Sequence, residues 1–406
     1  MSGKWPGGFI KKTAPTVVGP VDGEGGSASG IWTLDQAADY ESRGLWPKPV
    51  LNVEIYAWGY NYNGQLGDGS TVSKSSPVQV GSLTTWSVIE GAQPYGVHAF
   101  AIKKDGTMWS WGLNNYGQLG QGDTTQRNSP VQVGALTTWS TVAGSSYAGA
   151  SIKTDGTLWT WGENANGTLG LSNTTSGIYS PVQVGALTNW SKIVMGGYHC
   201  ASVKTDGTMW SWGLNNYGQL GQGNLTNYSS PVQVGALTNW LQASAGYRHT
   251  LAIKTDGTLW GWGYNNYGQL GQGNQTNYSS PVQVGALTTW LQVAGGLYTA
   301  IAVKTDGTLW TWGYNGQGGL GQGNLTNYSS PVQVGALTTW LQVASGYQNV
   351  LAVKTDGTLW GWGFNTRGQL GDGTVINRSS PVQIGALTTW KSVSCAQNSG
   401  YGKTQS

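Results

Sequence analysis

Short runs of apolar and β-branched residues recur along the chain at intervals of about 50 residues. Asp306 and Gly307 separate two such runs, and an Asp-Gly pair between apolar runs is the strongest local signal of a β-hairpin. In the run that follows, Trp310 and Trp312 are two residues apart, so both side chains are expected on one face of a strand. The strands predicted for the unit that begins near residue 290 cover residues 291–294, 300–305, 308–313 and 330–334.

This pattern is repeated seven times. Every unit contains the phrase W-G-x-N-x-x-G-x-L-G, and a fixed period near 50 residues is typical of repeat architectures such as propellers and solenoids. Four short antiparallel strands per unit, in seven units, describe a β-propeller. The tryptophans that open the seven copies are Trp58, Trp111, Trp161, Trp212, Trp262, Trp312 and Trp362.

The two ends of the chain distinguish a closed ring from an open solenoid. The first copy begins at residues 53–58 with no Lys-x-Asp-Gly hairpin directly in front of it, whereas residues 390–395 and 399–404 follow the last copy as two further strands. The end of the chain therefore supplies the first half of a unit and the start supplies the second half. We predict an all-β, seven-bladed propeller of four-stranded antiparallel blades over residues 51–406, closed by pairing of the terminal strands, with an N-terminal arm over residues 1–50.

The low charge of the chain limits the classes of partner that are expected. Charged residues make up 9% of the sequence and the net charge is +3, with no basic run longer than Lys11-Lys12. Nucleic acids and anionic membranes select clustered cations, so neither is an expected partner. No apolar stretch approaches 18 residues and no apolar core follows Lys4, so neither membrane insertion nor a secretory signal is expected. The 23 tryptophans supply a large apolar area to bury. A W-x-W pair is also suited to form a platform that stacks on a ligand, but we expect both rings of each pair to pack between blades.

No set of residues predicts catalysis. His98, His199 and His249 share one repeat position that other copies fill with unrelated residues, so each is expected to be hydrogen-bonded within its own blade. Cys200 and Cys395 are expected to stay unpaired. We therefore predict a protein that is not an enzyme, with no catalytic residues, no metal ligands and no cofactor. The aspartates expected to shape hairpin turns are Asp105, Asp155, Asp206, Asp256, Asp306 and Asp356.

Loops rich in Tyr and Asn recur in the units and are the remaining candidates for binding. A tyrosine ring stacks on the C–H face of a sugar, and neighbouring amides satisfy the sugar hydroxyls. The same composition is typical of ordinary solvated loops, so both interpretations stay open. The candidate glycan-binding residues are Tyr116, Tyr217, Tyr228, Tyr267, Tyr278 and Tyr328.

The units resemble the repeats of the regulator of chromosome condensation family, which form a seven-bladed propeller. The D-G-x-x-W-x-W-G core, the N-x-x-G-x-L-G loop and the histidine element at His98, His199 and His249 carry the resemblance, which covers about 350 residues. The resemblance implies a seven-bladed propeller fold. The family's nucleotide exchange on a nuclear GTPase and its chromatin binding are less expected here, because the units are nearly constant in length and a basic tail is missing.

The arm carries a second resemblance. Its segments S-G-I-W-T-L-D-Q-A-A and G-L-W-P are similar to a short segment of structural proteins of tailed bacteriophages. Thr33 to Gln36 fits a capping box and Gly44 fits a C-terminal stop, which predicts a helix at about residues 34–43. A helix this short is marginal alone, so it is expected to dock either on its own propeller or, in the favoured interpretation, on other virion proteins. Its candidate anchor residues are Trp32, Leu34 and Trp46.

These observations favour one function and leave two alternatives. The favoured hypothesis is a non-enzymatic virion structural protein of a bacteriophage, as a fibre, neck or capsid appendage whose propeller is tethered by the arm. Such a protein would be assembled in the host cytoplasm and act on the extracellular particle, where it would contact a host-surface glycan or protein. The first alternative is a free propeller scaffold that binds a protein or a glycan. A GTPase exchange factor or chromatin binder is the least favoured.

Overall fold

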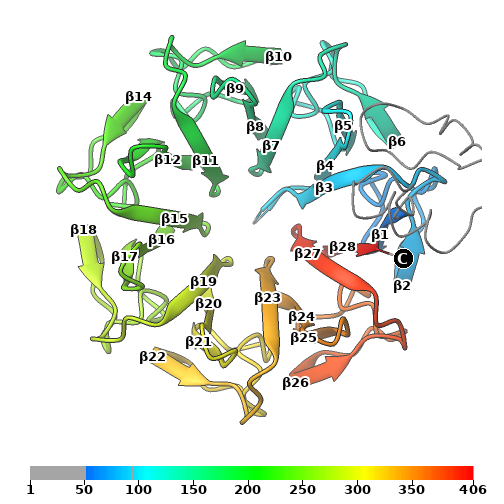
Figure 1. Cartoon of the computed structure of the whole chain (residues 1–406), viewed down its shortest axis with the longest axis vertical. Helices are drawn as coiled ribbons and strands as arrows, with labels where there is room; N and C mark the ends of the chain where they lie inside the picture. The colour runs from blue at the N-terminus through cyan, green and yellow to red at the C-terminus, as the bar shows by residue number, and fades with distance from the viewer. Residues whose placement is uncertain (1–51, 94, 406) are drawn as a thin grey trace, which may run out of the picture. The chain divides into compact units, whose positions relative to one another are not determined.

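Seven four-stranded antiparallel sheets are arranged around a common axis as the blades of a propeller (Figure 1). The computed structural model describes residues 52–93 and 95–405. The predicted all-β, seven-bladed fold is confirmed. The helix predicted at about residues 34–43, like the rest of the arm, lies outside the described residues. Within the part of the chain that the structure describes, no helix is long and apolar enough to cross a membrane.

Six blades are built from consecutive strands, and the seventh combines both ends of the chain. The blades are numbered in chain order, and the strands of each are given from the axis outward. Blade 1 contains β3 (Trp86–Gly91), β4 (His98–Lys103), β5 (Met108–Gly112) and β6 (Arg127–Gln132); blade 2 contains β7 (Trp139–Gly144), β8 (Ala148–Lys153), β9 (Leu158–Gly162) and β10 (Ile178–Gln183); blade 3 contains β11 (Trp190–Met195), β12 (His199–Lys204), β13 (Met209–Gly213) and β14 (Tyr228–Gln233); blade 4 contains β15 (Trp240–Ala245), β16 (His249–Lys254), β17 (Leu259–Gly263) and β18 (Tyr278–Gln283); blade 5 contains β19 (Trp290–Gly295), β20 (Thr299–Lys304), β21 (Leu309–Gly313) and β22 (Tyr328–Gln333); blade 6 contains β23 (Trp340–Ser345), β24 (Asn349–Lys354), β25 (Leu359–Gly363) and β26 (Arg378–Gln383); blade 7 contains β27 (Trp390–Cys395), β28 (Ser399–Gln405), β1 (Val53–Gly59) and β2 (Lys74–Gln79).

Blade 7 closes the ring as predicted. Its two middle strands, β1 and β28, pair antiparallel along seven consecutive residue pairs, from Val53 opposite Gln405 to Gly59 opposite Ser399. The hydroxyl of Tyr401, a fully buried residue of β28, donates to the carbonyl of Gln65 at 2.8 Å. The start and the end of the propeller are therefore held together by a continuous sheet and by a buried hydrogen bond.

The hairpin of blade 5 shows why the Asp-Gly pairs are repeated. Gly307 has a φ of 77°, which favours glycine, and its N–H donates to the Lys304 carbonyl at 2.9 Å. One oxygen of Asp306 accepts from the hydroxyl and the N–H of Thr308 at 2.7 and 2.9 Å, and these two bonds lower the pKa of Asp306. The aspartate thus shapes the turn, as predicted. All four strands of this blade begin and end within two residues of their predicted bounds.

The two tryptophans of each W-x-W pair have different surroundings. In blade 5, Trp312 is fully buried and its Nε1 donates to the Gln269 carbonyl of blade 4 at 2.9 Å. Trp310 also packs on the core between blades 4 and 5, but its ring is only partly buried. The ammonium of Lys304 lies 3.7 Å from the centroid of the Trp310 ring, which is a cation–π contact. The prediction that both rings pack between blades is therefore confirmed, but only Trp312 is fully buried.

Candidate functional site

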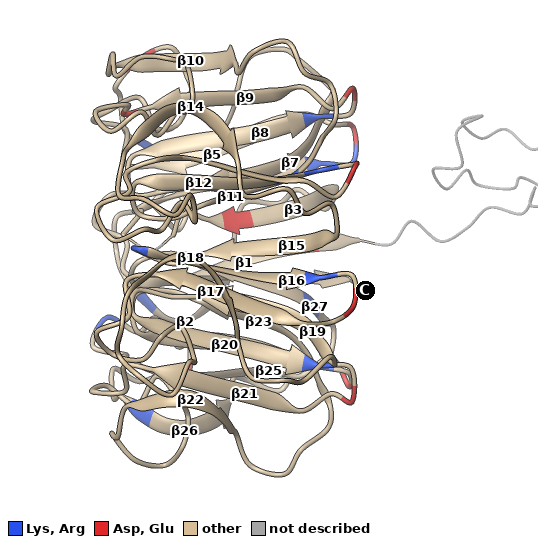
Figure 2. Ribbon diagram, turned by 90° about the vertical axis from the view of Figure 1, so that its left-hand side faces the viewer, with Lys and Arg blue, Asp and Glu red and all other residues tan. Residues whose placement is uncertain are grey.

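The two ends of the ring carry different residues. The Asp-Gly turns between the second and third strands of the blades lie at one end, where Lys and Asp or Glu residues gather (Figure 2). We call this end the hairpin face. The loops that join the first strand to the second and the third strand to the fourth lie at the opposite end. That end carries a connected set of aromatic rings, here called the tyrosine face, which consists of Tyr95, Tyr116, Tyr147, Tyr198, Tyr217, Tyr247, Tyr264, Tyr267, Tyr298, Tyr314, Tyr347 and Phe364.

The rings of the tyrosine face contact one another across blades. The centroid of Tyr95 in blade 1 lies 4.8 Å from that of Tyr247 in blade 4 and 5.3 Å from that of Tyr347 in blade 6. Blades 1 and 4 lie on opposite sides of the axis (Figure 1), so these rings meet over the centre of the face. Desolvation raises the pKa of Tyr95 well above its ordinary value and raises the pKa of Tyr198 to about 12. The hydroxyls therefore stay protonated and serve as hydrogen-bond donors.

An arginine is built into this aromatic surface. The guanidinium carbon of Arg248 lies 5.0 Å from the ring centroid of Tyr217 and 4.8 Å from that of Tyr247. One of its terminal nitrogens donates to the Tyr217 hydroxyl at 3.0 Å. Arg248 is itself partly exposed. The stacking holds the guanidinium in place, so a partner would meet an ordered cation rather than a flexible one.

The tyrosine face carries one small depression among its rings. The depression between Tyr147, Tyr198 and Glu163 holds about 10 Å³, which is about the volume needed for one water molecule. Burial raises the pKa of the Glu163 carboxyl. Sites for small molecules are concave and several hundred Å³ in volume. The geometry of this depression therefore favours contact with a large, complementary surface.

The six tyrosines predicted to bind a glycan fall into two groups at this end. Tyr116, Tyr217 and Tyr267 belong to the tyrosine face. The hydroxyls of the other three accept a hydrogen bond from an asparagine of the same loop, at 3.0 to 3.1 Å. Their glycan-binding role stays a prediction, and the candidate anchors Trp32, Leu34 and Trp46 lie outside the described residues. The three asparagine pairs are Asn224 with Tyr228, Asn274 with Tyr278, and Asn324 with Tyr328.

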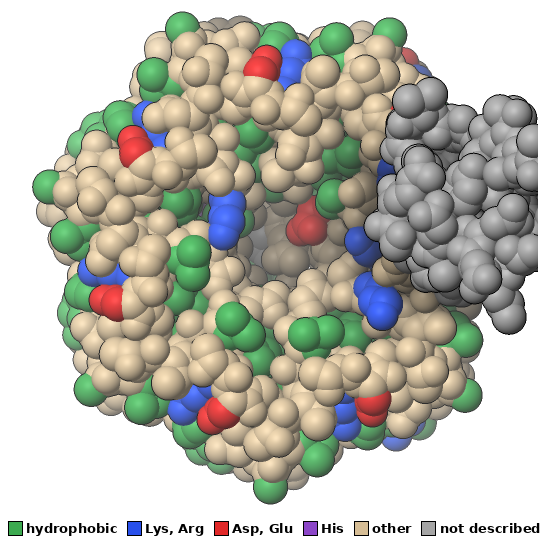
Figure 3. All heavy atoms as spheres, viewed as in Figure 1, with side chains coloured by type: hydrophobic (Ala, Val, Ile, Leu, Met, Phe, Trp, Pro, Cys, Tyr) green, Lys and Arg blue, Asp and Glu red, His purple; other side chains and the backbone are tan. Residues whose placement is uncertain are grey.

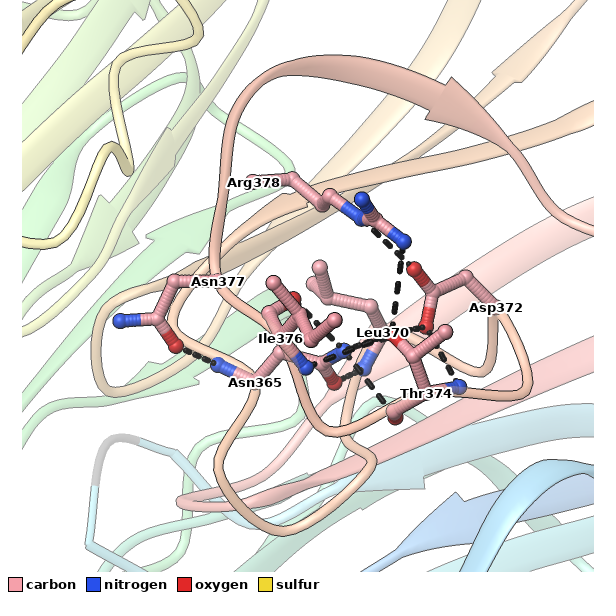
Figure 4. Close-up of polar contacts among 7 residues, drawn as sticks. All are labelled: Asn365, Leu370, Asp372, Thr374, Ile376, Asn377 and Arg378. Atoms are coloured by element: carbon pink, nitrogen blue, oxygen red, sulfur yellow. Dashed lines mark hydrogen bonds and ion pairs between the residues drawn. The ribbon is translucent and has the colours of Figure 1, made fainter.

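The asparagine of the repeated phrase organises the loop that carries it. Figure 4 shows this for Asn365, whose side-chain oxygen accepts from the Leu370 N–H at 2.9 Å and whose Nδ2 donates to the Ile376 carbonyl at 3.0 Å. In the same loop, Arg378 donates to Asp372 at 2.8 Å. Hydrogen bonds to Arg378 and to Thr374 hold the pKa of Asp372 below its ordinary value. The repeated asparagine is thus a structural residue that fixes the loops of the tyrosine face.

The histidines are buried between blades, and the expected bond within one blade is wrong for His199. Its Nε2 lies 3.0 Å from the hydroxyl of Thr250, which belongs to the next blade. Burial lowers the pKa of His98 and His199 to about 3 and that of His249 to about 4, so all three are neutral at pH 7. Among the described residues, no three or more His, Cys, Asp and Glu are placed to hold a metal ion. Both cysteines are buried and unpaired, as predicted.

The hollow at the centre of the ring (Figure 3) contains a carboxyl group that sequence reasoning missed. The innermost strands enclose a cavity of about 260 Å³ that Glu90 lines, together with residues such as Ala143, Ser244 and Ser394. Desolvation raises the pKa of Glu90 to about 8, against a hydrogen bond from Ser394 that lowers it. The sequence did contain a signal for Glu90, because its residue type differs from those at the same position of the other copies. The other copies carry Ala143, Val194, Ser244, Ala294, Ala344 and Ser394 at this position.

The inner tyrosines were also missed. Tyr147 and Tyr198 each immediately precede the second strand of a blade, and Tyr247 precedes its strand by one further residue. A tyrosine recurs at this point in six of the seven units. The pattern was visible, but the convergence of these rings over the axis depends on the diameter of the ring, which the sequence does not state.

The model of the RCC1-like domain family matches residues 55–402. The chain belongs to this family. Its RCC1-like propeller is 32% identical over 189 residues to the ultraviolet-B receptor UVR8 of Arabidopsis thaliana, which covers 43% of this chain and 40% of the receptor. It is 40% identical over 90 residues to the human probable E3 ubiquitin-protein ligase HERC3, which covers 22% of this chain and 8% of the ligase. The chain thus matches less than half the length of these relatives.

Solved structures with the same architecture include Prp20p from Saccharomyces cerevisiae and human WBSCR16. Prp20p superimposes with a TM-score of 0.78 at 19% identity, over 91% of this chain and 94% of Prp20p. For WBSCR16 the TM-score is 0.77 at 21% identity, over 87% of this chain and 98% of that one. At these identities the likeness shows the fold of the RCC1-like propeller alone.

Proposed function

We propose that this chain is a non-enzymatic binding protein that holds a protein partner against the tyrosine face. The observation that carries the proposal is the connected network of partly exposed tyrosines over six blades, with Arg248 stacked on Tyr217 and Tyr247. Tyr and Arg are enriched at protein interfaces and at their energetic hot spots. Tyrosine supplies a large contact area at a low cost in conformational entropy, as in antibody loops.

The charge and shape of this face agree with a protein partner. Arg248 and Glu163 are separate charges within a mainly uncharged aromatic surface, and the depression at Glu163 is too small for an organic ligand. One solved relative, Prp20p, is described as having binding properties toward Gsp1p and histones. That description concerns Prp20p and is consistent with protein binding as a use of the fold.

The test is affinity capture from the source cell with the full chain as bait, followed by quantitative mass spectrometry. Tyr247→Ala with Arg248→Ala removes the centre of the face and is expected to lower recovery of a specific partner at least tenfold. Leu287→Ser, at an exposed position in a connector of the hairpin face, is the matched control and should retain that partner. Equal recovery by all three baits, or loss in the control alone, would refute the proposal.

We propose a bacteriophage particle as the setting in which this binding takes place. The support is the sequence of the arm, whose segments resemble structural proteins of tailed phages. Trp32, Leu34 and Trp46 would anchor the arm on other virion proteins, and the tyrosine face would contact the host surface. Mass spectrometry of purified particles should find the chain, and deletion of residues 1–48 should abolish its incorporation. Absence of the intact chain from the particles would refute this setting.

A further inference from the structure

Three grooves of the same build lie between neighbouring blades. We name them after the partly buried tryptophan that lines each one: the Trp159, Trp260 and Trp360 grooves. Their volumes are about 200, 510 and 370 Å³. Ligand pockets in proteins are roughly 300–1,000 Å³. The Trp260 and Trp360 grooves are thus of the size of small-ligand sites. The Trp159 groove is smaller, but it is still far larger than the depression of the tyrosine face.

Each groove has an aromatic wall. In the Trp360 groove, Trp360 lies on β25, the strand between β24 and β26. The ammonium of Lys354, on the β24 side, lies 3.5 Å from the ring centroid of Trp360. Ser380 and Pro381 line the groove from β26, on the other side. The ring is therefore held between the lysine and the groove, and its Nε1 is already used by Thr358 at 2.9 Å.

Each groove also has a polar rim of fixed orientation. In the Trp260 groove, Nε2 of Gln222 donates to the Ser211 hydroxyl and to the Val232 carbonyl, both at 3.1 Å. Both N–H bonds of the amide are then used, which leaves its oxygen to accept from a ligand. Ser280 is exposed at the same rim and offers a hydroxyl. Gln322 is held in a similar way, with Nε2 at 3.1, 3.2 and 3.3 Å from three acceptors.

No charged side chain lines any of the three grooves. A neutral ligand therefore pays no cost for leaving a charge unpaired. The lining combines an indole face and an exposed leucine with an amide oxygen and a hydroxyl. A pyranose ring has the complementary surfaces, since it carries a face of C–H bonds and a rim of hydroxyls. An aliphatic peptide side chain would match the indole and the leucine but leave the polar rim unused.

We propose that the Trp159, Trp260 and Trp360 grooves each bind one neutral pyranose sugar. The C–H face of the sugar stacks on the tryptophan, and its hydroxyls donate to the glutamine oxygen and exchange hydrogen bonds with the rim serine. A single groove binds weakly, with a dissociation constant on the order of 1 mM.

The test uses saturation-transfer difference NMR on the full chain with four probes: the methyl glycosides of glucose, galactose, mannose and N-acetylglucosamine. At least one is expected to give signals from its ring C–H protons. Gln121→Leu, Gln222→Leu and Gln322→Leu together should weaken binding at least tenfold. Leu171 occupies the same repeat position in another copy, so the fold accepts leucine there. A second triple variant places a phenylalanine in each groove at an exposed position: Ser180→Phe, Ser280→Phe and Ser380→Phe. It should also lose sugar binding, and it tests the proposal if the leucine variant does not fold.

The control is Tyr217→Ala with Tyr267→Ala, which alters the tyrosine face and should leave the sugar signals unchanged. If tyrosine-face variants lose protein capture but keep the sugar signals, protein binding at the tyrosine face and sugar binding in the grooves are tested independently of each other. Absence of signal from all four probes would overturn the sugar site, as would full binding by both the leucine and the phenylalanine variants. A third result would also overturn the sugar site: the native grooves bind an aliphatic peptide but no sugar, and the leucine variant binds that peptide more tightly. The grooves would then be an apolar docking site.

Discussion

At the scale of single residues, Glu90 is the clearest departure from the repeat. A carboxyl faces the axial cavity where the other blades place Ala, Val or Ser. Removing a carboxylate from water without a neighbouring cation is costly, so the group is held largely in its protonated form at pH 7, and its pKa rises from 4.5 to about 8. The buried histidines His98, His199 and His249 are shifted in the opposite direction, because their charged form is the protonated one.

The pKa of Glu90 makes stability depend on pH above neutrality. Between pH 4.5 and 8 the folded chain holds a proton that the unfolded chain has released, so the free energy of unfolding falls as the pH rises. From pH 6.5 to 8.5 the expected loss is about 2 kcal/mol. Glu90→Gln should abolish this slope in chemical denaturation, and Glu54→Gln, on β1, is the control. The range begins at pH 6.5 because the histidines destabilise the fold below it. An unchanged slope in Glu90→Gln would contradict the assignment.

At the scale of the structural element, the loop between the third and fourth strands depends on one buried asparagine. In blade 3, Asn215 is fully buried, and its side-chain oxygen accepts from the Leu220 N–H at 2.9 Å. Its Nδ2 donates to the carbonyls of Asn224 and Thr226, both at 3.0 Å. A single side chain thus closes both halves of the loop. Tyr217 and the groove residue Gln222 lie within this loop, so its order affects both proposed sites.

Replacing this asparagine should therefore weaken the loop and the fold. Asn215→Ala leaves an N–H and two carbonyls without their partners, and the expected loss in the free energy of unfolding is about 2–4 kcal/mol. Asn216→Ala is the matched control, because Asn216 is adjacent and exposed. Denaturant titration gives both values, and hydrogen exchange should show faster exchange of the Leu220 amide in the first variant. Equal stability of the two variants would show that the buried hydrogen bonds are not the source of the loop's order.

The elements were the most predictable part of the molecule, for a physical reason. The Asp-Gly turn and the spacing of Trp310 and Trp312 are local signals, and local geometry is enough to fix a hairpin and the face of a strand. Packing across the ring is not local. The contact between Tyr95 and Tyr247 joins blades on opposite sides of the axis, and the groove at Trp260 combines residues of two blades. Neither follows from the pattern within one unit, so the candidate sites were only partly foreseen.

At the scale of the whole molecule, stability depends on closing the ring. Blade 7 has no covalent continuity between β28 and β1, and seven residue pairs hold these strands together. Trp58 of β1 and Trp390 of β27 are both buried in this blade, with ring centroids 6.0 Å apart. Each interface between blades is a hydrophobic core, so an open ring would expose such cores at both of its ends.

Deletion of residues 391–406 tests closure directly. It removes β28 and nearly all of β27, and with them the partner of β1 and the buried residues Val393, Cys395 and Tyr401. Burial of such side chains is worth about 1.5–3 kcal/mol each, and domains are stable by only about 5–15 kcal/mol, so the melting temperature should fall by more than about 10 °C.

The matched control is a circular permutant that joins residue 405 to residue 53 by a short Asp-Gly linker and opens the chain before Ser82, an exposed connector residue. It places all four strands of blade 7 in one continuous segment, as in the other six blades, and should melt no lower than residues 52–406. If calorimetry gave the truncated chain the same melting temperature as the intact one, pairing of the two chain ends would not be what stabilises the propeller.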